Sequence, residues 1–333
     1  MKAQIPWLSL AVFAGVLAST ALALAALCGR LIPYLDIFTH VAPLYAAGCV
    51  GGLVSAAWVK PPLRQLIAAV GCVGLVACAV LIGPELLALG PKRPLPARGE
   101  TLKVIQFNSW GREFNRPRER DWLLKQDADV IVLQESKGLS DDLIRRGYHL
   151  SCGNCYAAIF TKAAPLWSNT PGNWRIHPPP VSIATIPGAG GPITIMGVHR
   201  SWPTRPPVYR GQMADLARAA AGFPKRFLII AGDFNSTPWS FARRDEDLEL
   251  GLERRTRALF TWPAARADHV RISSPLPVLP IDHVYAGAGW LTADVSRGPN
   301  LGSDHYPVVV TLIRERPDRT QPIVGTLGQE DRR

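Results

Sequence analysis

Asp233 and Asn235 are the polar pair in this chain whose type and spacing most directly suggest chemistry. They follow the apolar run Leu228–Ala231, which predicts a short buried strand, and Gly232 is expected to let the backbone turn sharply. Side chains two residues apart in a strand point the same way. A carboxylate beside an amide therefore suits a phosphate and a hard metal ion. The alternative is an ordinary strand-to-turn junction, because Gly, Asp and Asn are common turn residues.

Other apolar runs of the sequence also end in polar groups suited to phosphate chemistry. Asn108, Glu135 and His199 follow such runs, and Asp304 and His305 precede the last one. Carboxylate oxygens are the ligands that Mg²⁺ and Mn²⁺ prefer, so the set predicts a hard cation. His305 can act as a general base on water only if a neighbour orients its ring, and Asp282 is the best candidate for that neighbour.

Six short motifs occur in an order that is typical of a known family. They are Phe107-Asn108, Leu133-Gln134-Glu135, Gly197-Val198-His199, Gly232-Asp233-Phe234-Asn235, Ile281-Asp282-His283 and Ser303-Asp304-His305. Across about Leu102 to Ile313 the chain resembles the endonuclease/exonuclease/phosphatase superfamily, which includes DNase I, apurinic endonucleases, neutral sphingomyelinases and inositol-polyphosphate 5-phosphatases. Thr261-Trp262-Pro263 also resembles bacterial, membrane-anchored members.

The resemblance implies a fold, a cofactor and a role for each site residue. The fold is a DNase I-like four-layer α/β/β/α sandwich of the α/β (α+β) class. Mg²⁺ or Mn²⁺ is held by Glu135, with Asn108 and Asp304 assisting. Asp233 and Asn235 position the nucleophilic water and the scissile phosphate, and His199 stabilises the transition state. His305, held by Asp282, handles the proton.

The first hundred residues differ in texture from the rest of the chain. Three runs without Lys, Arg, Asp or Glu, namely Ala3–Gly29, Ile37–Val59 and Gln65–Pro84, are each long enough to cross a bilayer as a helix. A cleaved signal peptide is the alternative for the first run. Two further runs favour a three-helix membrane region over that alternative.

Four segments follow from this texture: three transmembrane helices over 1–89, a Pro-rich linker over 90–100, the endonuclease/exonuclease/phosphatase domain over 101–314, and a disordered tail over 315–333. Within the domain, many short apolar runs with few helices between them predict a mixed, two-sheet architecture. Helices are expected at Arg116–Gln126 and Tyr209–Ala221. The stretch from Arg243 to Arg257 is expected to be a polar segment.

Charge and cysteine placement bear on partners and on location. Of the net charge of +11, about +7 belongs to residues 101–333, which favours anionic partners such as nucleic acid, phosphate esters or anionic lipid. The short loop with Lys60 and Arg64 favours a domain facing away from the cytoplasm. Cys152 and Cys155 agree if they form a local disulfide. We therefore expect an integral protein of a bacterial inner (cell) membrane, with its catalytic domain on the periplasmic or extracellular side.

The combined prediction is a membrane-anchored, divalent-metal-dependent phosphoesterase that hydrolyses phosphodiester bonds, of nuclease type. A phospholipid or inositol-phosphate phosphoesterase acting at the membrane is the alternative. From another class, a non-catalytic membrane-tethered binding module is also open. Arg200 and Arg205, on either side of Trp202, either grip a second phosphate or belong to a solvated surface. His283 is expected on the opposite face of its strand from Asp282, and His149, His177 and His269 are expected to be ordinary histidines.

Overall fold

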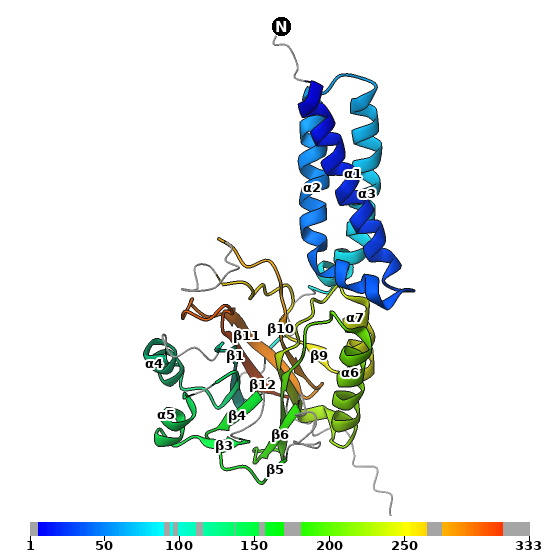
Figure 1. Cartoon of the computed structure of the whole chain (residues 1–333). Coiled ribbons are helices and arrows are strands. Elements are labelled where there is room, and N and C mark those ends of the chain that lie inside the picture. The colour runs from blue at the N-terminus through cyan, green and yellow to red at the C-terminus, as the bar shows by residue number, and fades with distance from the viewer. Residues whose placement is uncertain are drawn as a thin grey trace, which may run out of the picture.

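Three helices stand on a two-sheet domain in the computed structural model (Figure 1). The structure describes residues 6–89, 94–95, 99–110, 116–136, 138–152, 157–169, 181–264 and 275–315. Residues 316–333, most of the 90–100 linker, Cys155, His177 and His269 lie outside this set. The predictions made for them therefore stay predictions.

The amino-terminal region contains α1 (Pro6–Cys28), α2 (Ala42–Ser55) and α3 (Leu63–Leu87). Short 3₁₀ helices flank α2, namely η1 (Pro33–Val41) and η2 (Ala56–Trp58). All three predicted spans are long and apolar enough to cross a membrane. Small residues let the helices approach closely, because a Cβ added to Gly52 would lie 1.8 Å from Val16 Cγ2.

Two sheets of six strands each form the centre of the second region. In spatial order, the first sheet contains β11 (Trp290–Arg297), β12 (Val308–Arg314), β1 (Thr101–Asn108), β2 (Val130–Gln134), β4 (Ala157–Thr161) and β3 (His149–Ser151). The second contains β5 (Trp167–Asn169), β6 (Val181–Ile186), β7 (Ile193–His199), β8 (Leu228–Asp233), β10 (Asp282–Ala286) and β9 (Glu253–Arg254). Each sheet has one parallel pair at its centre, β1 with β2 and β7 with β8, while its other pairs are antiparallel.

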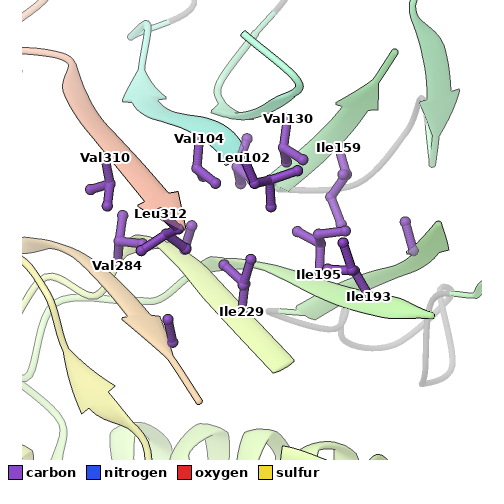
Figure 2. Packing of buried hydrophobic residues seen from close by; sticks show 14 of the residues in the cluster. Leu102, Val104, Val130, Ile159, Ile193, Ile195, Ile229, Val284, Val310 and Leu312 are labelled. Carbon is purple, nitrogen blue, oxygen red and sulfur yellow. The ribbon is translucent and has the colours of Figure 1, made fainter. Parts of the chain in front are cut away.

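The sheets pack face to face over an apolar core. Figure 2 shows Val104, Val130 and Val310 of the first sheet opposite Ile195, Ile229 and Val284 of the second, and all six are fully buried. On the outside, α4 (Arg116–Gln126) and α5 (Ser140–Arg145) cover the first sheet, and α6 (Pro206–Ala221) and α7 (Phe241–Leu250) cover the second. The predicted four-layer α/β/β/α sandwich is therefore confirmed.

Two local expectations are wrong. The stretch predicted as a polar segment is a helix, α7, followed by strand β9, and its Arg243 and Glu246 are fully buried. Gly232 does not turn the chain, because it lies inside strand β8. Its missing side chain instead permits close strand packing, since an added Cβ would lie 2.0 Å from the Val198 carbonyl oxygen.

Candidate active site

The carboxyl ends of both parallel strand pairs meet at one edge of the sandwich. Parallel strands end on the same side, so β1 and β2 bring Asn108 and Glu135 together, and β7 and β8 bring His199 and Asp233 together. The Asn108 amide joins the two sheets. Its Nδ2 donates to Glu135 Oε1 at 3.2 Å and to Asp233 Oδ2 at 3.1 Å.

Two imidazoles lie beside the same Asp233 oxygen. His199 Nε2 is 3.8 Å from both Asp233 Oδ2 and Glu135 Oε1, and His305 Nε2 is 3.7 Å from Asp233 Oδ2. The other ring nitrogen of His305, Nδ1, is 2.9 Å from Asp282 Oδ2. Asp282 is in turn held by Gln106, whose Nε2 donates to Oδ1 at 2.9 Å. Asp282 thus orients the His305 ring, in the geometry that the sequence suggested.

Backbone strain is concentrated at this edge. Glu135 has φ 53° and Asn235 has φ 50°, which is left-handed backbone that residues other than glycine seldom adopt. Strand β8 ends at Asp233, so the expectation that strand alternation aligns the two side chains does not apply to Asn235. Instead, the Asn235 backbone N–H donates to Asp233 Oδ1 at 2.8 Å, and its side-chain Nδ2 donates to the Arg200 carbonyl at 2.7 Å. Asn235 therefore fixes the carboxylate through its backbone.

Burial and neighbouring charges shift the pKa values of Asp233 and His305. Burial raises the pKa of Asp233 to about 6; His305 and His199 oppose this shift, and Asp282 adds to it. For His305, burial favours the neutral ring, but Asp282 and Asp233 outweigh it and raise the pKa of His305 to about 10. At neutral pH the site accordingly holds a weakly basic carboxylate beside an imidazolium.

The donors gathered here suit a hard cation. Asp233, Asp282 and His305 place potential ligand atoms within 4.8 Å of one another, although His305 could bind a cation only after losing its proton. Glu135 adds a carboxylate whose side chain is 38% exposed and thus reachable from solvent. Asp304 Oδ2 accepts from Trp262 Nε1 at 3.2 Å, while Asp304 Oδ1 is buried without a hydrogen-bond partner among the described residues. A buried carboxylate oxygen without a partner is costly, and a cation or a bound ligand would satisfy it.

Some residues lie where the sequence did not lead us to expect them. Arg200 is fully buried and donates both arms of its guanidinium to Glu246, so it is unavailable to a second phosphate. Two supporting side chains were missed. Besides Gln106, Ser303 Oγ donates to the Asn108 carbonyl at 2.6 Å and accepts from the His305 N–H at 3.1 Å. For Ser303 the signal was available, since it directly precedes Asp304 and His305 in a motif.

The prediction for His283 is confirmed. Its ring is buried against Phe234 and Tyr285, and its Nε2 lies 2.9 Å from the Ser236 carbonyl. Burial and the nearby guanidinium of Arg254 keep the pKa of His283 well below its ordinary value. It is thus a neutral core residue, on the face of β10 opposite the site.

Comparison with known proteins agrees with this geometry. The model of the endonuclease/exonuclease/phosphatase family matches residues 105–305, which hold every site residue described above. The chain belongs to this family. It is therefore a hydrolase of phosphate esters, with the DNase I-like fold. Enzymes of the endonuclease/exonuclease/phosphatase family typically use a divalent metal, and the oxygen-rich donor set of this site fits such an ion.

Solved structures share the fold at low sequence identity. A functionally unknown conserved protein from Enterococcus faecalis aligns with a TM-score of 0.52 at 15% identity, over 64% of this chain and 100% of the other. A family protein from Leptotrichia buccalis gives 0.51 at 15% identity, over 63% and 99%. The protein SmcL gives 0.50 at 18% identity, over 64% and 99%. No curated protein matches the chain.

Proposed function

We propose that this chain is a membrane-anchored, divalent-metal-dependent phosphodiesterase. The observation that carries the proposal is the convergence on Asp233, within 4 Å, of one amide and two imidazoles from different strand ends. Such a site mainly positions reacting groups and stabilises charge, which is what phosphoryl chemistry needs. We assign Glu135 to the metal, assisted by Asn108 and Asp304. A divalent ion bound there would polarise the phosphate oxygens.

The pKa values favour different roles in proton transfer for Asp233 and His305. Asp233, with its pKa of about 6, is ionised at pH 7 yet basic enough to take a proton from an attacking water. His305, with its pKa of about 10, is already protonated, so it acts as a proton donor to the leaving oxygen rather than as the base expected from the sequence. The two protons then balance: water loses one to Asp233, and the leaving group gains one from His305. His199 stabilises the charge that develops on the phosphate.

Nucleic acid is the first substrate class that we propose, because the second segment carries about +7 charge and a polyanion binds such a surface. Phospholipid head groups are the second class, and a specific observation favours them. The loop after β8, two residues beyond Asn235, is hydrogen-bonded to the membrane-spanning region, since the Thr237 N–H donates to His40 Nδ1 at 3.2 Å. The edge of the sandwich that holds the candidate site thus faces helices α1 to α3 and the membrane that these helices would cross.

The membrane side is also part of the proposal. If all three candidate helices cross an inner membrane, the amino terminus and the domain lie on its opposite sides. Cys152 is disulfide-bonded, which supports a domain in an oxidising compartment outside the cytoplasm. A reporter enzyme fused to the carboxyl terminus measures on which side of the membrane the domain lies. Activity of a reporter that functions only in the cytoplasm would contradict the proposed side.

The decisive test uses the full chain in detergent or nanodiscs. DNA, RNA, phospholipid vesicles and inositol phosphates are each incubated with Mg²⁺, with Mn²⁺ and with EDTA. We expect metal-dependent hydrolysis of at least one substrate, lost in Asp233→Asn. Hydrolysis of DNA supports a nuclease, and hydrolysis confined to vesicles supports a lipid phosphodiesterase. Metal and substrate binding without turnover of any substrate would instead support the binding-module alternative.

A further inference from the structure

The helical region does more than anchor the domain, because it binds the chain segment that directly follows Asn235. This segment, Ser236–Ala242, follows Asn235 and includes the first two residues of helix α7. We propose, resting on the function proposed above, that Asp36 and His40 of η1 are positioning residues for catalysis. They would hold Asn235 in its strained conformation from outside the catalytic domain.

His40 contacts the segment two residues after Asn235. Its Nδ1 accepts from the Thr237 backbone N–H at 3.2 Å and lies 2.9 Å from Thr237 Oγ1. A ring nitrogen that accepts a backbone N–H carries no proton, so Nε2 bears it and Thr237 Oγ1 is also a donor. The carbonyl of His40 accepts from Trp239 Nε1 at 3.2 Å. One residue thus fixes two points of the segment.

Asp36 holds the other end of the segment at the start of α7. Its Oδ1 accepts from the Phe241 N–H at 2.9 Å, and its Oδ2 accepts from the Ala242 N–H at 3.0 Å and from Ser240 Oγ at 2.8 Å. The first N–H groups of a helix have no partner within the helix, and a carboxylate beside them is stabilising. Asp36 therefore caps α7 from a distance of about two hundred residues along the chain.

Trp239 joins the same segment to the helical region by apolar contact. Only 1% of Trp239 is exposed, and it packs in one cluster with Ala26, Tyr45 and Leu81 of the helical region. A buried tryptophan in such a cluster resists movement, because moving it would open a cavity. The segment is thereby held by hydrogen bonds at both ends and by packing in its middle.

A second connection leads from α7 back to Asn235. Glu246 of α7 pairs with Arg200, and the Arg200 carbonyl accepts the Asn235 side chain at 2.7 Å. The Arg200 N–H donates to the Asp233 carbonyl at 3.0 Å. Asp233 and Asn235 therefore depend on elements that η1 positions. Because misplacement of reacting groups by about 1 Å can cost about 100-fold in rate, loosening η1 should lower catalysis.

The test compares variants of the full chain at the His40 position. His40→Leu removes the acceptor, whereas the Oδ1 of His40→Asn can replace Nδ1 and still accept from Thr237. We expect His40→Leu to lower kcat about 10- to 100-fold with KM changed less than about threefold. His40→Asn should restore most of kcat. Wild-type kcat in His40→Leu, or no rescue by His40→Asn, would overturn the proposal.

Two further variants separate positioning from a general effect on the interface. Asp36→Asn places an amide N–H₂ among three donors and should also lower kcat, which keeps the proposal testable if His40→Leu does not fold. Arg30→Ala removes an exposed ion pair with Asp245 and a contact with the Phe241 ring at the same junction but none of the hydrogen bonds of Asp36 and His40, so it serves as the matched control. An equal loss of kcat in Arg30→Ala contradicts a specific role for Asp36 and His40.

Hydrogen exchange distinguishes failure of this proposal from failure of the proposed function. If the wild-type chain hydrolyses nothing, the proposed function is wrong, but positioning can still be measured. We expect exchange at the Asn235, Thr237 and Phe241 amides to rise at least tenfold in His40→Leu or Asp36→Asn, and to stay at wild-type values in Arg30→Ala. Unchanged exchange in both η1 variants would contradict the positioning role independently of any activity.

Discussion

Two clusters of buried charge are partnered in different ways. At the catalytic edge, Asp233, Asp282 and His305 form the catalytic cluster, where carboxylates meet amides and imidazoles. Around helix α7, Arg200, Arg243 and Glu246 form the α7 cluster, in which a single carboxylate lies between two guanidinium groups and all three side chains are fully buried. Both clusters are equally remote from water, so burial alone does not separate their roles.

The two clusters differ in the groups that pair with their carboxylates. In the α7 cluster, and at Glu85, whose two oxygens accept from Arg254 at 2.8 and 2.7 Å, guanidinium forks match the carboxylates. In the catalytic cluster the nearest donors to Asp233 Oδ2 are an amide at 3.1 Å and imidazoles at 3.7 and 3.8 Å. This difference favours a structural role for the α7 cluster, and it supports the cation binding and proton transfer that we propose for the incompletely neutralised catalytic cluster.

The largest expected effect comes from a substitution within the catalytic cluster. Asp233→Asn should lower activity by about 10³-fold or more, because it removes the proposed proton acceptor. The folded-state pKa of Asp233, about 6, exceeds its ordinary value of about 4, so the contribution of Asp233 to stability is lost as pH rises through about 6. The stability lost in Asp233→Asn should therefore be smaller at pH 8 than at pH 4. Thermal unfolding in EDTA at both pH values, beside a metal-dependent assay, checks both expectations.

The second prediction breaks the α7 cluster. Glu246→Gln leaves Arg200 and Arg243 buried without their shared carboxylate, which should cost about 3–5 kcal/mol of stability. Denaturant unfolding of the full chain in mild detergent measures the loss. Arg30→Ala is the control, because its partner pair is exposed and should leave the unfolding transition unchanged. A wild-type transition in Glu246→Gln would show that paired burial is not what stabilises α7.

A third variant, Asp282→Asn, lies inside the catalytic cluster but outside the set of Glu135, Asn108 and Asp304 that we assign to the metal. It should lower kcat roughly 10²-fold, because the His305 ring loses its orienting carboxylate. Asp282 raises the pKa of His305, so its removal should move the alkaline limb of the pH–rate profile to lower pH. A profile that keeps its alkaline limb would contradict the assignment of His305 as the proton donor.

Residues at strand ends were predictable from the sequence, because the local pattern of apolar and polar residues defines them. Runs such as Leu228–Ala231 are buried on both faces and thus wholly apolar, and the polar residues that follow each run mark the edge of the sheet. Asp233, Glu135 and Asn108 were found in this way. Gln106 was not, because it lies within strand β1 and looks like an interruption of an apolar run.

What could not be predicted depends on partners far along the chain. Arg200 suggested a phosphate contact because its neighbour in sequence is a loop, whereas its partner Glu246 lies 46 residues later. Helix α7 looked polar for the same reason. Asp36 and His40 border or interrupt an apolar run, which is a signal of function in a membrane segment, but their partners lie about two hundred residues away.

The last and smallest effect concerns Glu119, a buried carboxyl far along the chain from either cluster. It lies on helix α4 at 2% exposure, and burial raises the pKa of Glu119 to about 7 despite the opposing charge of Arg116. A raised folded-state pKa contributes stability below the unfolded pKa of about 4.3, and this contribution is lost as pH rises through about 7. Glu119→Gln should therefore stabilise the chain by about 1–3 kcal/mol at pH 8 and by little at pH 4.

Thermal unfolding at both pH values measures the effect of Glu119→Gln, and Asp121→Asn, at an exposed position of the same helix, is the matched control. Activity should stay at the wild-type value, because Glu119 contacts neither the catalytic nor the α7 cluster. A pH-independent change in Glu119→Gln would mean that its carboxyl is neutralised by a partner, as in the α7 cluster. A gain in stability together with intact activity would show that incomplete pairing of a buried carboxyl marks function only where several such groups converge on one edge of the sheets.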